Sequence, residues 1–288
     1  MIYLLFSILS ASSITLLFKV LERKSVPLLP AIIINYLAAF IVGILFYSGT
    51  IDLPAIRESN WFALSGITGV LFILGFFLIG ITTQKAGIAI TTIANKMSVI
   101  IPISFSILYY HEAMTLVKTG GIMLALIAVI MAAYRKPALG KWTTASFLPL
   151  IMFLVVGGID SVIKLAQESY VPANDVSLFS ALTFGSAGII GIILLLFKPG
   201  YWKSFNNAWL WGLGTALGLA NFGSMFFLMN ALNHAQLDSS IVYGVNHLGV
   251  ILVSILLALL LFHERLSLLN RIGILLAAVA ISILTMLV

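Results

Sequence analysis

The sequence predicts an all-α integral membrane protein with ten transmembrane helices arranged as two inverted five-helix repeats. Three observations support this fold class: the composition, a series of apolar segments of spanning length, and a repeat shared by the two halves. Of the 288 residues, 61% are hydrophobic and only 8% are charged. Soluble domains carry about a quarter charged residues, so a polytopic membrane protein is expected.

The apolar segments set the number of predicted helices. A helix needs about 20 apolar residues to cross the hydrocarbon core of a bilayer. Ten segments meet this requirement approximately: 2–18, 28–47, 61–82, 87–110, 116–134, 146–166, 175–197, 208–232, 238–262 and 267–288. The breaks at 83–86 and 233–237 are short, and we interpret them as hairpin turns.

Spaced residues recur in the same order in both halves of the chain. Lys19, Pro27 and Gly43 match Lys164, Pro172 and Gly188 at an offset of 145; Trp61, Gly66 and Gly75 match Trp209, Gly214 and Gly223 at 148; His111, Glu112, Leu116 and Gly121 match His263, Glu264, Leu268 and Gly273 at 152. These matches predict two five-helix units, residues 1–135 and 145–288. Because five is odd, the second unit enters the membrane inverted, as in many secondary transporters.

The basic residues predict an orientation. Loops after the odd-numbered spans contain Lys19, Arg23, Lys24, Lys85, Arg135, Lys136, Lys141, Lys198, Lys203, Arg265 and Arg271, against Arg57, Lys118 and Lys164 on the other side. The positive-inside rule places the first group in the cytoplasm and both termini outside it. Trp61, Trp142, Trp202 and Trp209 fall near the predicted membrane interfaces, where amphipathic rings are enriched.

Composition also limits the chemistry. The chain has no cysteine, which excludes disulfides, thiol catalysis and cysteine metal sites. The adjacent pairs His111-Glu112 and His263-Glu264 do not have the spacing of a zinc motif. We therefore expect no catalytic residues, metal or cofactor, and no nucleic-acid partner, in a monomer surrounded by membrane lipids.

The fourth and fifth helices of each predicted half resemble those of a known family. Residues 81–132 and their repeat at 230–287 each contain a helix ending in Glu, then a short turn and a Gly-containing helix. In this they are similar to the drug/metabolite transporter superfamily, in its ten-helix EamA-like branch. The resemblance implies transport of amino acids, other metabolites or drugs, and cytoplasmic termini. That orientation conflicts with the charge pattern.

The segment 87–110 carries the most informative charge in the chain. Lys96 lies near its middle, where family members usually have a neutral residue, and its repeat partner is Leu248. An ionisable group at membrane depth usually faces a protein interior or a water-filled cavity. Lys96 and Asn95 therefore predict a substrate-binding site, with Asn246 and His247 at the equivalent depth of the second half. A proton-coupling site is a second functional interpretation of Lys96, and structural pairing or snorkelling of Lys96 is the alternative to both.

Other polar residues extend the predicted site. Asp160 is an acid well inside a predicted span, where it could balance Lys96 or simply pair with Lys164 one turn away. Tyr243, Asn221 and Gln84 complete the candidate lining, although a polar group in a span often only joins helices. Pro102 predicts a kink or hinge. Glu112 and Glu264 are predicted to have structural roles at the N-termini of the helices that follow them.

These observations predict a secondary active transporter of the cell membrane, the bacterial inner membrane. It would move a small organic metabolite, such as an amino acid or another carboxylate-bearing compound, by alternating access driven by protons or a counter-substrate. An exporter of drugs or toxic compounds is the alternative within the same fold. A membrane-embedded enzyme or a channel is less favoured, because the four histidines form no catalytic set and no ring of charges is evident.

Overall fold

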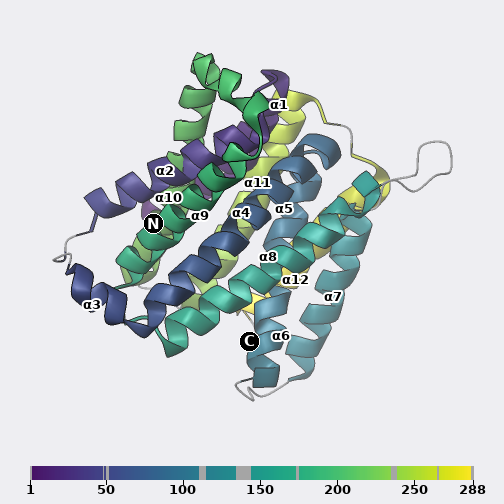
Figure 1. The fold of residues 1–288 in the computed structure, drawn as a ribbon. Coiled ribbons are helices and arrows are strands. Elements are labelled where there is room, and N and C mark those ends of the chain that lie inside the picture. The colour runs from purple at the N-terminus through teal and green to yellow at the C-terminus, as the bar shows by residue number, and fades with distance from the viewer. Residues whose placement is uncertain are drawn as a thin grey trace. The chain divides into compact units, whose positions relative to one another are not determined.

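The computed structural model describes residues 2–47, 49, 52–109, 115–133, 144–172, 175–234, 239–264 and 266–286, and these residues are helical or lie in short connections (Figure 1). The helices are α1 (Ile2–Arg23), α2 (Leu28–Leu45), α3 (Leu53–Glu58), α4 (Asn60–Ala86), α5 (Ile88–Met97), α6 (Ile100–Tyr109), α7 (Leu116–Ala133), α8 (Thr144–Ser169), α9 (Val176–Leu196), η3 (Pro199–Asn206), α10 (Ala208–His234), α11 (Ser239–Phe262) and α12 (Leu268–Met286). Within this part of the chain, six helices are long and apolar enough to cross a membrane: α1, α2, α4, α9, α10 and α11.

The chain divides into two compact units. Unit 1 comprises Met1–Lys19, Leu78–Gly158 and Gly223–Val288, and unit 2 comprises Val20–Phe77 and Ile159–Phe222. Each unit takes residues from both predicted repeats, so the compact units differ from the sequence repeats. The repeat boundaries at 135 and 145 remain a prediction.

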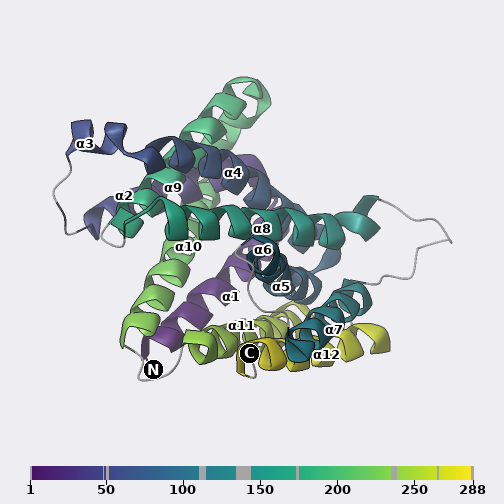
Figure 2. The ribbon, with the colours of Figure 1, turned by 90° about the horizontal axis from the view of Figure 1, so that it is seen from below.

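Helix packing within each unit joins segments from the two halves. In unit 1, α7 packs along α12, and α5 packs against α11 and α7 (Figures 1 and 2). In unit 2, α2 packs along α9. Glycines allow close approach in unit 2, because a Cβ at Gly218 of α10 would lie 2.5 Å from the backbone oxygen of Asn35 on α2.

Helices begin and end at matching positions in the two halves. After α1, the Val26 N–H donates to the Leu21 carbonyl at 2.9 Å, and after α8 the Val171 N–H donates to the Ala166 carbonyl at 2.9 Å. Such six-to-one hydrogen bonds terminate helices, and Pro27 and Pro172 follow them in the sequence. Each of these residues differs from its counterpart by the offset of 145.

The first turns of two further helix pairs also match. Phe62 bonds to the Ser59 carbonyl at the start of α4, and Leu210 bonds to the Asn207 carbonyl at the start of α10, both at an offset of 148. At an offset of 152, Thr119 bonds to the Thr115 carbonyl in α7, and Arg271 bonds to the Ser267 carbonyl in α12.

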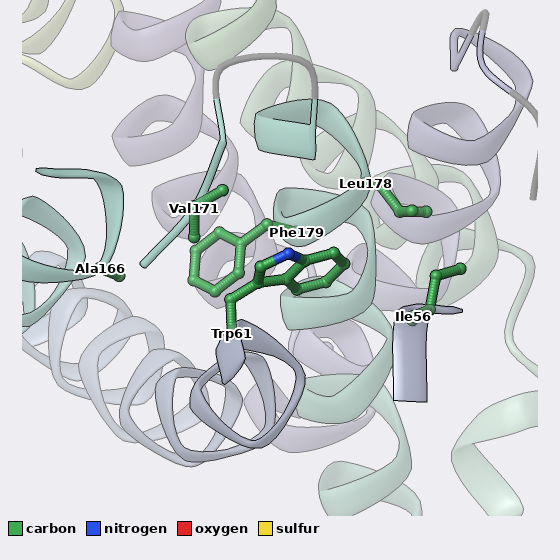
Figure 3. Close-up of a cluster of buried hydrophobic side chains, with 6 residues drawn as sticks. All are labelled: Ile56, Trp61, Ala166, Val171, Leu178 and Phe179. Atoms are coloured by element: carbon green, nitrogen blue, oxygen red, sulfur yellow. The ribbon is translucent and has the colours of Figure 1, made fainter. Parts of the chain in front are cut away.

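An apolar cluster in unit 2 holds the start of α4 against α8 and α9. Trp61 and Phe179 meet edge to face, with ring centroids 6.2 Å apart, beside Ile56, Val171 and Leu178 (Figure 3). Trp61 is only 3% exposed, and its predicted position near a membrane interface stays a prediction. The apolar ring is buried inside the protein, where aromatic area contributes most to stability.

Candidate substrate site

The predicted helix 87–110 is broken near its middle. α5 ends at Met97 and α6 begins at Ile100. Pro102 has no N–H to donate, and its ring conflicts with a helical carbonyl four residues earlier, at Ser98. The Ser98 carbonyl instead accepts the Ile101 N–H at 2.9 Å, and the Ser98 N–H bonds to the Asn95 carbonyl at 3.3 Å. The sequence predicted a kink or hinge at Pro102, and the structure shows a two-residue turn at Ser98 and Val99 between two helices.

Lys96 lies in the last turn of α5, next to the break. Lys96 and Asn95 are partly buried, whereas Ile93, Ala94 and Met97 around them are buried. A cation at this end of a helix is stabilised by the partial negative charge of its terminal carbonyl groups. The local structure therefore favours an ammonium at the point where the helix is interrupted.

The predicted second-half partners lie in the same unit as Lys96. α5, which carries Lys96, packs against α11, which carries His247. Beside His247, the buried Asn246 donates from Nδ2 to Ser7 Oγ at 2.8 Å. Ser7 in turn donates to the Ser224 carbonyl at 3.0 Å. Unit 1 thus holds Asn95 and Lys96 on one helix and Asn246 and His247 on a helix packed against it, from the two halves of the sequence.

A polar side of α1 was missed by the sequence reasoning. Besides Ser7, the buried Ser12 donates to the Val250 carbonyl of α11 at 3.5 Å, and the buried Thr15 accepts from Thr92 Oγ1 of α5 at 3.5 Å. α1 therefore supplies hydroxyl groups to both helices of the candidate site. The available signal was the run of serine and threonine residues at positions 7, 10, 12, 13 and 15 of an otherwise apolar segment.

Charged side chains hold both ends of the turn between α4 and α5. Lys19 Nζ donates to the Gln84 carbonyl at 3.2 Å, near the C-terminus of α4. The Glu264 carboxylate accepts the N–H of Ile88 at 2.7 Å and that of Ala89 at 3.3 Å, at the N-terminus of α5. Both charges have the sign that the adjacent helix dipole favours. For Gln84, the structure therefore shows a backbone contact with Lys19.

Glu264 caps a different helix from the one predicted. The sequence suggested that it would serve the following helix, α12, but α12 is capped by its own residues. Asn270 Oδ1 accepts the N–H of Ser267 at 3.1 Å, and Ser267 Oγ accepts the N–H of Asn270 at 3.2 Å. This reciprocal arrangement provides hydrogen-bond acceptors for backbone N–H groups at the N-terminus of α12. Glu264 instead caps α5, another helix of unit 1.

Two of the remaining candidates, Asp160 and Asn221, are not grouped with Lys96 in unit 1. Asp160 and Asn221 belong to unit 2, so the predicted balance between Asp160 and Lys96 stays a prediction. Asn221 Nδ2 donates to Asn35 Oδ1 at 3.4 Å, an amide contact between α10 and α2. Glu112 lies outside the described residues, and so does the side chain of Tyr243.

The site suits ligand binding by polar contact. Across the described ranges, no group of three or more His, Cys, Asp or Glu side chains could hold a metal ion. The assembled groups are an ammonium, an imidazole, amides and hydroxyls. Such groups can bind an anionic or hydrogen-bonding solute.

Comparison with known proteins gives a shared fold and one related sequence. No protein-family model matches the chain. An uncharacterized protein of Haemophilus influenzae is 26% identical over 288 residues, covering 96% of this chain and 95% of the relative. A protein of known crystal structure aligns with a TM-score of 0.63 and 18% identity, covering 99% of this chain and 96% of that one. The chain is therefore similar in fold to a solved protein.

Proposed function

We propose that this protein is a secondary transporter of the EamA-like branch of the drug/metabolite transporter superfamily. It moves a small organic metabolite across the cell membrane by alternating access. The observation that carries the proposal is the broken helix α5–α6, with Lys96 beside the break. Interrupted helices that present charged and polar groups at membrane depth form the substrate sites of many secondary transporters.

The helix arrangement supports ten spans in two inverted repeats. Besides the six long apolar helices, the described residues contain four shorter apolar segments: Ile88–Pro102, Thr119–Ala128, Phe147–Ile163 and Leu268–Ile283. The pairs α2 with α9, α5 with α11 and α7 with α12 pack together, and each pair joins predicted repeat partners. Such pairing is expected when two copies of one unit are related by an axis in the membrane plane.

The composition of the site favours a carboxylate-bearing metabolite, such as an amino acid. Lys96 supplies a positive charge, and the Asn246–Ser7 pair supplies oriented amide and hydroxyl groups. A lipophilic drug would leave these polar groups without hydrogen-bonding partners, at a cost in binding free energy. The driving force is a proton or a counter-substrate.

The test is counterflow in proteoliposomes against a panel of carboxylates, amino acids and neutral metabolites. The proposal predicts that a preloaded substrate drives saturable uptake of the same labelled compound. Empty liposomes and a neutral sugar serve as controls. Flux that rises linearly with concentration would indicate a channel, and the absence of flux for the whole panel would remove the assignment to metabolite transport.

A further inference from the structure

The segment 197–211 and the end of α1 form an exposed surface rich in aromatic and basic side chains, and we name it the aromatic–basic platform. The sequence FKPGYWKSFNNAWLW has six aromatic residues, two lysines and no acid. It contains three of the five tryptophans of the protein. Arg23 lies in the last turn of α1, and Lys24 follows it.

The platform is ordered by contacts of its own. Trp211 Nε1 donates to the Phe205 carbonyl at 2.8 Å, and the two rings are 5.8 Å apart. Phe205 also packs on Trp202 at 6.0 Å. Lys24 Nζ lies 4.3 Å from the Trp209 ring centroid, a cation–π distance. These contacts fix η3 beside the start of α10 and place Lys24 on the same surface, all within unit 2.

Core packing does not account for these aromatic side chains. No residue of η3 is buried, and Trp202, Trp209 and Trp211 are 49%, 52% and 52% exposed. Exposed indole rings are favoured at the boundary between hydrocarbon and lipid headgroups, where the ring is apolar and its N–H is polar. The basic residues Arg23, Lys24, Lys198 and Lys203 outnumber Glu22, which gives the surface a positive charge.

We propose that the aromatic–basic platform binds the headgroups of anionic phospholipids in the adjacent leaflet. The aromatic rings enter the interfacial layer, and the ammonium groups of Lys198 and Lys203 contact lipid phosphates. Basic residues at a membrane surface attract anionic lipids and contribute additively. This inference requires a membrane protein and is independent of the proposed cargo.

The platform can be tested by fluorescence, because most tryptophans lie in it. The variant with Trp61→Phe and Trp142→Phe keeps only Trp202, Trp209 and Trp211. It is placed in phosphatidylcholine nanodiscs containing equal fractions of brominated phosphatidylglycerol or brominated phosphatidylcholine, whose bromine atoms quench nearby indoles. The proposal predicts stronger quenching by the anionic lipid. Equal quenching by the two lipids would overturn it.

Charge variants test whether the platform lysines confer the preference for anionic lipid. Lys198→Gln and Lys203→Gln should each reduce this preference about five-fold, while quenching by the neutral lipid persists. Lys85→Gln, at an exposed lysine of α4, should retain the preference. An equal loss in Lys85→Gln would contradict a localised surface.

Inorganic phosphate added to neutral nanodiscs should leave the emission unchanged, and a response would assign the surface to free phosphate instead.

Discussion

The Glu264 carboxylate accepts the backbone N–H of Ile88 at 2.7 Å, which joins the loop after α11 to the first turn of α5. The other end of α5 carries Lys96. The helix therefore has an anion at its N-terminus and a cation at its C-terminus, and both stabilise its dipole. Within the proposed mechanism, this contact fixes the helix that presents Lys96.

Removing this cap should destabilise the protein. Glu264→Ala leaves two N–H groups of α5 without their acceptor, and we expect a loss of about 1–2 kcal/mol in the free energy of unfolding. Thermal unfolding in detergent, followed by circular dichroism, measures the change. Glu58→Ala, at the exposed end of α3, is the matched control. Equal melting temperatures for Glu264→Ala and the wild type would show that the contact contributes nothing.

Gly87 should not tolerate a side chain. Its φ is +96°, and a Cβ there would lie 2.8 Å from Glu264 Oε2. Gly87→Ala is expected to cost roughly 1–3 kcal/mol through backbone strain and to displace the Glu264 carboxylate. Gly120→Ala on α7 is the control, since a Cβ at that position meets nothing within 4 Å. The same unfolding assay should separate the two variants, and similar losses in both would argue against a specific turn.

The Ser7–Asn246 hydrogen bond should matter for substrate affinity. Asn246→Ala and Ser7→Ala should each raise the KM for counterflow, and the double variant should resemble Asn246→Ala alone. The expected coupling energy is about 1 kcal/mol. Ser13→Ala is the control, because Ser13 bonds to the Leu9 carbonyl within its own helix. Strict additivity of the two single changes would show that Ser7 does not position Asn246.

Pro102 should maintain the break between α5 and α6. The repeat partner of Pro102 is Ser254, which lies within the continuous helix α11. Pro102→Ser supplies an N–H for the Ser98 carbonyl, so the two short helices should join. We expect slower hydrogen–deuterium exchange over 98–102 and a lower turnover number in counterflow. Pro199→Ser, at the exposed first position of η3, is the control. Unchanged exchange over 98–102 would assign the break to another cause.

Much of the helical layout could be predicted because hydrophobic length is a local property. The boundaries near Pro27 and Pro172 follow from residues that end helices wherever they occur. The short helices α3 and η3 were missed, because they lie in polar connections without a spanning apolar run.

Contacts across the fold were harder to predict. Glu264 was assigned to α12 because that helix is adjacent in sequence, whereas the α5 terminus is 175 residues away or more. In the structure, Ser267 and Asn270 cap α12 and Glu264 caps α5. The α1 hydroxyls were missed for a similar reason, since a serine in an apolar segment can bond within its own helix or across to another.

Lys96 is the residue on which the proposed function most depends. Lys96→Met keeps much of the apolar stem but removes the charge, and Lys96→Ala removes both. Lys85→Met, at an exposed lysine in the same unit, controls for a general loss of charge. Substrate counterflow by these variants in proteoliposomes is the most direct measurement. The proposed role of Lys96 predicts that both Lys96 variants lose saturable counterflow while Lys85→Met retains it. Counterflow by both Lys96 variants with wild-type KM and pH dependence would contradict that role.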